Sequence, residues 1–257
     1  MPPVGYDVSL ITPTRERPEA VALCQRWMGR QRYHGSVQWI IVDDSPYPSP
    51  HMPLLKFKLP GGGTIHRTVV RRDPEPNSVQ SFAGNILNGI NWLRAPKVLI
   101  IEDDDWYDRY YLRQMTDRLD HADLVGEIKA RYYHVRTRRY NVGSNLHHAS
   151  LCRTGLRADF LPRLQHACEL ARQDNNPWID LYLWGTRPGV EQDFNTNLFD
   201  GANLSVGMKG LPGRGGLGSG HARGNYPGED PDGVMLRHWL GADADAYLGY
   251  YEPAAVA

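Results

Sequence analysis

The sequence has few cysteines and no long hydrophobic segment. Its three cysteines, Cys24, Cys152 and Cys168, are odd in number and lack the spacing of a metal-binding motif, which favours reduced thiols in a cytoplasm-like compartment. No apolar run approaches the length of about 18 residues that a membrane-spanning helix requires, and the N-terminus shows neither a basic leader nor an apolar signal segment. We therefore expect a soluble, cytoplasmic protein without membrane attachment.

The sequence also lacks an excess of either charge. The 29 acidic residues balance 29 basic ones, so the composition indicates no strong global attraction to nucleic acid or to an anionic membrane. Lysine is scarce, with 5 residues against 24 arginines. Arginine suits bidentate contacts with phosphate or carboxylate, although a biased genome composition would enrich it equally well. The 257 residues, 41% of them hydrophobic, suffice for one large α/β domain or two small ones.

Short apolar runs alternate with helical patterns in the first half of the chain. Strands are expected at residues 8–11, 38–42, 64–70 and 98–101, and helices at 19–32, 78–93 and 108–119. This alternation predicts an α/β fold with a mainly parallel central sheet flanked by helices. The second half is less regular: we expect strands at 124–128, 132–135 and 147–151, a helix at 159–173, and a glycine-rich loop at 201–220 with little regular structure.

The most informative segment is residues 98–105, where an apolar strand ends in four consecutive acids, Glu102 to Asp105. Adjacent carboxylates repel one another, so a fold keeps such a cluster most readily where a cation neutralises it. Mg²⁺ and Mn²⁺ bind one or two carboxylates and keep positions open for water and phosphate. The alternative is an acidic turn in which one Asp caps the helix that starts near Trp106.

Two other strands end in polar residues. The first runs into Thr12-Pro13-Thr14-Arg15 and the second into Asp43-Asp44-Ser45. Ligands of open parallel sheets bind outside the carboxyl ends of the strands. The convergence of three polar strand ends on one edge therefore predicts a binding site.

These three segments, in this order, resemble the nucleotide-diphospho-sugar glycosyltransferases of the GT-A fold, most of all the large family 2. The resemblance covers residues 7–120 well and 120–200 loosely. It implies a single GT-A domain over residues 1–257. Residues 1–120 would bind the nucleotide sugar, and residues 121–257 would form an irregular acceptor and catalytic half that includes the loop at 201–220.

The resemblance assigns the nucleobase and ribose to the first two strand ends. A uracil-type base offers an imide N–H that a carboxylate or a backbone carbonyl accepts. Asn85, on the helix before the acidic strand, would approach the nucleotide or would serve only the packing of that helix. For Asp43 and Asp44 the alternative is a simple strand-ending turn. The residues implied in nucleotide binding are Thr12, Pro13, Arg15, Asp43, Asp44 and Asn85.

The acidic cluster corresponds to the Asp-X-Asp motif of that family, which binds a divalent cation, Mn²⁺ or Mg²⁺, on the donor diphosphate. Either Glu102-X-Asp104 or Asp103-X-Asp105 could be the motif pair. The resemblance favours Asp104 as the direct ligand and Asp103 as a ribose or metal neighbour. Asp105 and a late histidine, His221, would complete the metal site.

The glycine-rich segment at 201–220 can cradle phosphate with successive backbone N–H groups, to which Lys209 and Arg214 add charge. It could equally be a lid that orders over the donor.

Inverting members of the family use a carboxylate to deprotonate the acceptor hydroxyl. Asp180, in Pro177-Trp-Ile-Asp-Leu-Tyr-Leu-Trp184, is the closest match and our candidate general base. Asp193 and Asp200 are the alternatives, and Asp180 could instead be a helix N-cap.

Residues 131–140 interleave aromatic and basic side chains, a composition used to stack bases and neutralise phosphate, or a solvated hairpin. Some virus-encoded glycosyltransferases of similar plan modify hydroxymethylated pyrimidines in DNA; for such a chain the compartment would be the host cytoplasm. A saccharide, a lipid-linked glycan or a protein is also open as the acceptor. We thus predict a metal-dependent glycosyltransferase with UDP as the expected nucleotide. The alternatives are a nucleotidyltransferase, which the absence of a glycine-rich loop after the first strand disfavours, and a non-catalytic nucleic-acid-binding module.

Overall fold

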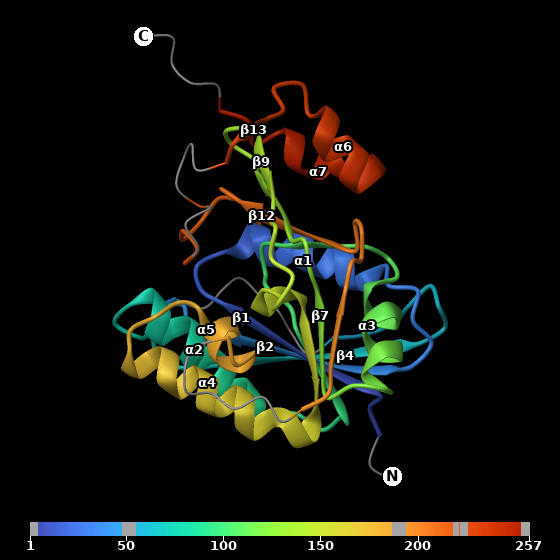
Figure 1. Cartoon of the computed structure of the whole chain (residues 1–257), viewed down its shortest axis with the longest axis vertical. Helices are drawn as coiled ribbons and strands as arrows, with labels where there is room; N and C mark the ends of the chain where they lie inside the picture. Colours follow the sequence, from blue (N-terminus) through green and yellow to red (C-terminus); the bar gives the residue numbers. More distant parts are fainter. Residues whose placement is uncertain (1–4, 48–54, 187–193, 218–220, 222–225, 253–257) are drawn as a thin grey trace.

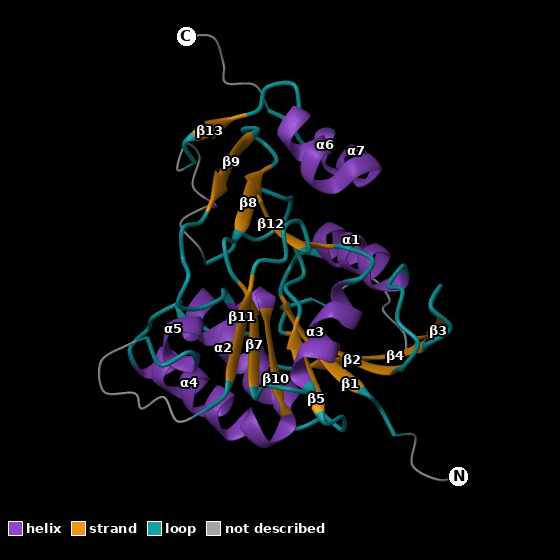
Figure 2. Ribbon diagram, turned by 45° about the vertical axis from the view of Figure 1, so that its right-hand side comes forward, coloured by secondary structure: helices purple, strands orange, loops and turns teal. Residues whose placement is uncertain are grey.

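The computed structural model describes residues 5–47, 55–186, 194–217, 221 and 226–252. The fold is built on an eight-stranded sheet in the order β11-β7-β10-β5-β1-β2-β4-β3, in which the neighbours β5, β1, β2 and β4 run parallel (Figure 2). Its strands are β1 (Val8–Thr14), β2 (Ser36–Asp43), β3 (Leu55–Lys58), β4 (Thr64–Arg71), β5 (Lys97–Ile100), β7 (Leu124–Glu127), β10 (Thr154–Arg157) and β11 (Thr196–Phe199). The predicted α/β fold with a mainly parallel central sheet is confirmed.

Helices cover both faces of this sheet (Figure 1). Successive strand residues point to opposite faces. Leu10 accordingly packs in a core with α1 and α3, whereas Ile11 packs in a second core with α2, α4 and α5. The four predicted helices are confirmed, with ends that differ by a few residues at most. They are α1 (Pro18–Gly29), α2 (Ser78–Ile90), α3 (Tyr111–Leu119) and α4 (Leu161–Gln173). A short helix, α5 (Ile179–Leu183), was not predicted. None of the described helices is long and apolar enough to cross a membrane.

A second, five-stranded sheet has the order β13-β9-β8-β12-β6. Its strands are β6 (Trp106–Tyr107), β8 (Arg131–His134), β9 (Arg139–Val142), β12 (Ser205–Lys209) and β13 (Gly228–Glu229). The expected glycine-rich loop at 201–220 is therefore partly a strand, because Val206 and Met208 alternate into the core. Gly207 belongs in that strand because a Cβ there would lie 2.4 Å from the ring of Tyr132 on β8.

The expected strand at residues 147–151 is wrong. Residues 147–150 lack regular structure, and a short 3₁₀ helix, η1 (Leu151–Arg153), leads directly into β10. The side chain of Asn145 explains the irregular backbone: its amide donates to the carbonyl of His148 at 2.7 Å, and its oxygen accepts the backbone N–H of His147 at 3.1 Å. A side chain that satisfies nearby backbone groups competes with strand pairing.

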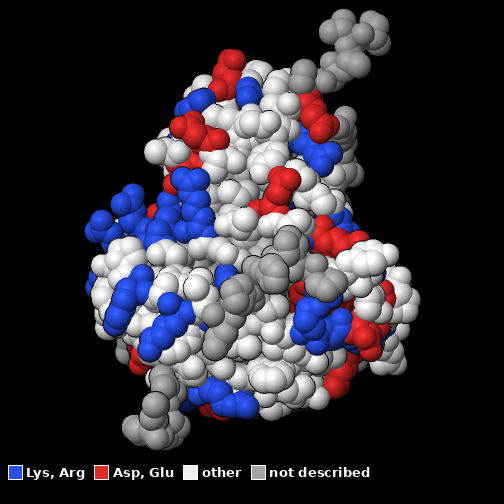
Figure 3. All heavy atoms as spheres, turned by 180° about the vertical axis from the view of Figure 1, so that it is seen from behind, with Lys and Arg blue, Asp and Glu red and all other residues white. Residues whose placement is uncertain are grey.

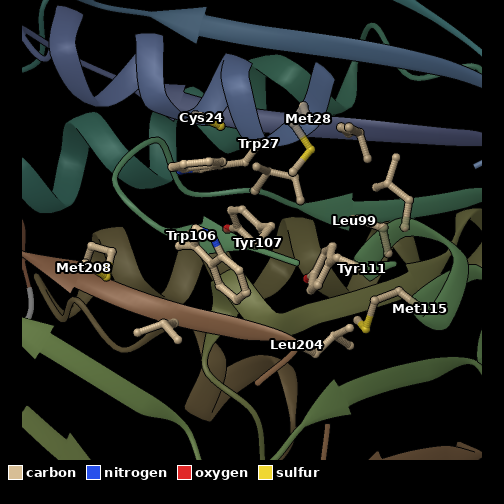
Figure 4. Packing of buried hydrophobic residues seen from close by; sticks show 14 of the residues in the cluster. Cys24, Trp27, Met28, Leu99, Trp106, Tyr107, Tyr111, Met115, Leu204 and Met208 are labelled. Atoms are coloured by element: carbon tan, nitrogen blue, oxygen red, sulfur yellow. The ribbon is translucent and has the colours of Figure 1, made fainter. Parts of the chain in front are cut away.

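The core between α1 and the second sheet is rich in aromatic side chains (Figure 4). Trp27 and Met28 of α1 lie against Trp106, Tyr107 and neighbouring residues of the small sheet and of α3. Residues near the end of the described chain complete this core. The two helices α6 (Val234–Leu240) and α7 (Asp245–Leu248) lie near α1, and the indole of Trp27 donates a hydrogen bond of 2.7 Å to the hydroxyl of Tyr247.

A buried ion pair joins the two sheets. The guanidinium of Arg153, which is fully buried, donates to the carbonyls of Ser205 on β12 at 2.9 Å and of Arg131 on β8 at 2.6 Å. It also lies 3.4 Å from the carboxylate of Glu127 on β7, which accepts the hydroxyl of Ser205 as well. One side chain therefore fixes β8 and β12 of the small sheet relative to β7 of the large one.

We expect Arg153→Met to lower the free energy of unfolding by about 3 to 5 kcal/mol, because it leaves Glu127 buried without its cation. Urea denaturation would measure this. The double variant Glu127→Leu with Arg153→Met should regain most of the loss, since it removes both charges. Arg157→Met, at an exposed arginine that pairs with Asp159, is the matched control and should cost less than about 1 kcal/mol. Equal stability of Arg153→Met and the control would contradict the role of the pair.

Candidate active site

A cavity of about 330 Å³ lies where β1 and β5 end, with β8, β12 and α5 on its other side. Because β1 and β5 are parallel neighbours, the segments that follow them emerge at the same edge of the sheet. Most of the predicted site residues line this cavity: Pro13, Arg15, Asn85, Asp103, Asp104, Asp180, Lys209, Arg214 and His221. Thr12, Asp43, Asp44 and Asp105 are absent from its lining.

Arg17 binds two members of the acidic cluster. Its guanidinium donates to Asp103 Oδ1 at 2.8 Å and to Asp104 Oδ2 at 3.1 Å, and Asp103 also accepts the hydroxyl of Thr14 at 2.6 Å. The Nε of Arg17 donates to the carbonyl of Arg214 at 2.7 Å, which attaches the segment after β12 to the site. Arg17 was not among the expected site residues, and Thr14 entered only as part of the polar end of the first strand. Thr14 is the last residue of β1, and Arg17 follows three residues later, so the polar strand end indicated their neighbourhood but not their contacts.

Two further basic side chains approach Asp104. Lys209 Nζ lies 3.9 Å from Asp104 Oδ2, and His221 Nε2 lies 3.8 Å from the same oxygen. Burial opposes ionisation of Asp104, but Lys209 and Arg17 outweigh it and lower its pKa to about 2. Burial, and then Lys209, lowers the pKa of His221 to about 3. Asp104 is therefore a carboxylate, and His221 is a neutral imidazole that offers a lone pair.

The cluster fits a divalent cation. Asp104 Oδ1 is buried and has no hydrogen-bond partner among the described residues. Within the described part of the chain, the four consecutive acids form ion pairs with only two permanent cations, Arg17 and Lys209. Burial, and then Asp105, raises the pKa of Glu102 to about 8, the response of a carboxylate with too little positive charge nearby. Asp104 and His221 could hold the ion, with the carboxylates of Glu102 and Asp103 beside them.

Asp105 lies behind the cavity wall rather than in it. Its Oδ1 accepts the backbone N–H of Met208 at 2.9 Å and lies 3.5 Å from Lys209 Nζ. Ligand atoms of Asp105, Glu102 and Cys152 lie within 4.8 Å of one another, so Asp105 borders the cluster. Through these contacts Asp105 joins the acidic segment to β12. Asp104, in contrast, lines the cavity.

Asp44 organises the side of the cavity formed by β1 and α2 from beneath it. This fully buried carboxylate accepts hydrogen bonds from Ser81 at 2.9 Å and from the amide of Asn85 at 2.8 Å. Its other oxygen lies 3.5 Å from Arg15 Nη1. Asp44 thus sets the positions of three residues that line the cavity, Arg15, Ser81 and Asn85.

Thr12 and Asp43 also point elsewhere. The hydroxyl of Thr12 accepts the indole N–H of Trp39 at 2.9 Å, on the α1 side of the sheet. Asp43 accepts the backbone N–H of Ser45 at 2.9 Å and pairs with Arg71 at the end of β4. The strand-ending turn that was the alternative for Asp43-Asp44-Ser45 is therefore present, and Asp44 adds its support of the cavity.

Asp180 enters the cavity from α5, beside Pro177 and Trp178. The N-cap of α5 is Trp178, so Asp180 lies inside the helix rather than in the N-cap position considered as its alternative. Burial raises the pKa of Asp180 to about 6, although backbone N–H groups oppose the shift. Its carboxylate lies 3.8 Å from His148 Nε2, and burial lowers the pKa of that histidine.

The other candidate bases differ from Asp180. Asp200 forms an exposed ion pair with Lys129 at 2.9 Å and does not line the cavity. Asp193 lies outside the described residues. Of the two candidates that the structure describes, Asp180 and Asp200, Asp180 is the one that lines the cavity.

Arg214 follows β12 and closes another part of the wall. Its guanidinium donates to the hydroxyl of Ser78 at 2.9 Å, at the first residue of α2, and Gly215 and Gly216 line the cavity beside it. The segment after β12 therefore brings both a cation and small residues to the start of a helix, where backbone N–H groups favour anions.

The basic and aromatic segment at residues 131–140 forms the β8–β9 hairpin. Three of its four arginines donate hydrogen bonds to backbone carbonyls of the protein. Arg136 donates to the carbonyl of Gly210 at 2.6 Å, Arg138 to that of Pro231, and Arg139 to that of Tyr226 at 3.0 Å. On the face shown in Figure 3, basic and acidic side chains form small groups separated by neutral surface. The hairpin alternative thus agrees with the observed contacts of these arginines.

Comparisons with known proteins support the fold only. No family model matches the sequence, and no curated protein matches it either. Among solved structures, the crystal structure of S. aureus TarS aligns with a TM-score of 0.54 and 12% identity over 79% of this chain and 36% of the other. The structure of S. aureus TarS 1-349 in complex with UDP aligns with a TM-score of 0.51 and 12% identity, over 79% and 60%. This chain therefore shares the fold of TarS and spans between about a third and three fifths of those chains.

We expect Asp44→Ala to lower the free energy of unfolding by about 3 kcal/mol, because Ser81, Asn85 and Arg15 lose a buried charged acceptor. Urea denaturation would measure the loss, with Asp73→Ala, at an exposed acid, as the matched control. A cost below about 1 kcal/mol would show that Asp44 does not support the cavity wall.

Proposed function

We propose that this chain is a metal-dependent glycosyltransferase that uses a nucleotide-diphosphate sugar, with UDP as the expected nucleotide. One observation carries the proposal: a single cavity combines an acidic cluster that fits a divalent cation with a separate buried carboxylate, Asp180, whose pKa is raised. TarS, which shares the fold, is a glycosyltransferase and has been crystallised with UDP. The likeness of the two folds supports the proposal but leaves the activity to be tested.

The donor would occupy the side of the cavity formed by β1, α2 and the segment after β12. Arg15 and Asn85, held by Asp44, would contact the nucleoside. Arg214 and the N-terminus of α2 offer positive potential to the diphosphate. Lys209, whose pKa is raised by Asp104 despite its burial, keeps its charge near the phosphates.

A divalent ion held by Asp104 and His221 would neutralise charge on the diphosphate leaving group. The protein residues around the ion would hold its ligands in place. Arg17 holds Asp103 and Asp104 in fixed positions through hydrogen bonds of 2.8 and 3.1 Å. A preformed arrangement of charges needs little reorganisation during the reaction, which is the main source of electrostatic catalysis.

Asp180 would accept the proton of the acceptor hydroxyl. A base is most effective when its pKa is near the working pH, and burial moves the pKa of Asp180 in that direction, to about 6. His148 Nε2 lies 3.8 Å from the carboxylate of Asp180, and burial lowers the pKa of this histidine.

We expect Asp104→Asn to abolish the Mn²⁺-dependent part of UDP binding, because it removes the carboxylate with the free buried oxygen. Isothermal titration with UDP, with and without Mn²⁺, would measure the change, and we expect a loss of tenfold or more in affinity. Asp200→Asn, in an exposed ion pair outside the cavity lining, is the control and should behave as the wild type. Unchanged Mn²⁺ dependence in a folded Asp104→Asn protein would refute the metal site.

We expect Asp180→Asn to reduce sugar transfer by about 10² to 10⁴-fold while it leaves UDP affinity unchanged, since it removes only the base. In the wild type, kcat/KM should fall as the pH decreases through about 6, because protonation disables the base; an unshifted Asp would lose activity only near its ordinary value of about 4.

The assay would follow release of UDP from a UDP sugar, because pyrophosphate release would instead indicate a nucleotidyltransferase. Parallel losses of UDP affinity and transfer in Asp180→Asn would assign Asp180 a structural role. A flat profile between pH 5 and 7 would contradict its place as the base.

A further inference from the structure

Trp178 presents an aromatic surface to the cavity next to the proposed base. It lines the cavity two residues before Asp180 and is 44% exposed, whereas Trp27, Trp39 and Trp184 are buried in the cores. An aromatic side chain in a cavity wall that also carries polar groups offers a surface for a ligand. The ligand in question is the acceptor, because the nucleotide side of the cavity is formed by other elements.

The backbone of Trp178 is held by local hydrogen bonds. Its backbone N–H donates to the side chain of Asn176 at 3.0 Å, and its carbonyl accepts the N–H of Leu181 at 3.2 Å. Pro177 restricts the backbone immediately before it. A rigid aromatic group loses little conformational freedom on binding and therefore favours affinity.

The elements around Trp178 contribute no positive charge to the cavity lining. None of the described lining residues contributed by β8, β9, η1 and α5 is a lysine or an arginine. The cations of the cavity come from the end of β12 and from the segments that follow β1 and β12, and they already have partners: Arg15 with Glu75, Arg17 with Asp103, Lys209 with Asp105 and Arg214 with Ser78. Lys209 Nζ lies 6.0 Å from the ring centroid of Tyr132, and this ammonium is committed to the acidic cluster. A phosphodiester acceptor beside Trp178 would face the carboxylate of Asp180.

Building on the proposed function, we propose that the acceptor is a neutral, hydroxyl-rich carbohydrate ring that stacks on Trp178 with its reacting hydroxyl at Asp180. The apolar C–H face of a sugar suits an indole, and its hydroxyls suit the polar groups nearby, Asn141 and Ser150. In the reaction, the acceptor oxygen bonds to the anomeric carbon of the donor and its proton passes to Asp180. The bond from that carbon to the diphosphate breaks, and its electron pair leaves with UDP.

Saturation-transfer NMR on the full chain with UDP and Mn²⁺ tests this proposal. The probes are methyl β-glucoside and methyl β-N-acetylglucosaminide, against an oligonucleotide that contains 5-hydroxymethylcytosine. We expect at least one glycoside to bind the wild type, and its affinity to fall about tenfold in Trp178→Ala and recover in Trp178→Phe. The oligonucleotide should give no signal. Trp92→Ala, at an exposed tryptophan outside the cavity lining, is the control and should leave binding unchanged.

Glycoside binding that survives Trp178→Ala would overturn the proposal, and so would binding of the oligonucleotide without binding of either glycoside. A wild type that binds UDP but neither glycoside would overturn it as well. Titration of UDP in the same samples separates this failure from failure of the proposed function, because loss of Trp178 should not alter UDP affinity.

Discussion

The buried contacts of Arg153 are the interaction on which the rest of the structure depends. This side chain satisfies carbonyls of β8 and β12 and the carboxylate of Glu127 at once. Since Lys209 ends β12 and Tyr132 lies on β8, the same contacts place both residues at the cavity. A charge so deeply buried is costly unless all its partners are present. The second sheet is therefore held in one position relative to the first. The cavity walls that the two sheets contribute consequently stay at a fixed distance and orientation.

The acidic cluster shows a conflict between stability and chemistry. Four adjacent acids would be disfavoured in a fold selected only for stability, and the protein offsets part of their repulsion with Arg17 from the loop after β1 and Lys209 from β12. The compensation is incomplete, as the raised pKa of Glu102 indicates. Such uncompensated charge is typical of binding sites, where a ligand supplies the missing part.

The sequence predicts the central sheet because its apolar runs are buried on both faces, so composition alone marks them. It also predicts that the ends of β1 and β5 meet. It could not predict β12, because the glycine content masks the alternation of Val206 and Met208. Nor could it separate Asp44 beneath the wall from Asp104 within it, or identify Arg17, because these distinctions depend on side-chain directions set by distant segments. The resemblance to glycosyltransferases implied a nucleotide-binding role for Thr12, with Asp43 nearby; in the structure, Thr12 bonds to Trp39 and Asp43 pairs with Arg71.

The contact between Trp27 and Tyr247 has a consequence for synthesis of the protein. The two residues are separated by 220 positions. At ordinary rates of translation, roughly 10 to 40 seconds pass between the synthesis of Trp27 and the synthesis of Tyr247. During that interval Trp27 and Met28 lack the cover that α7 provides in the finished fold, and a chaperone has a natural place to bind. Completion of this core therefore follows the synthesis of α1 by that interval.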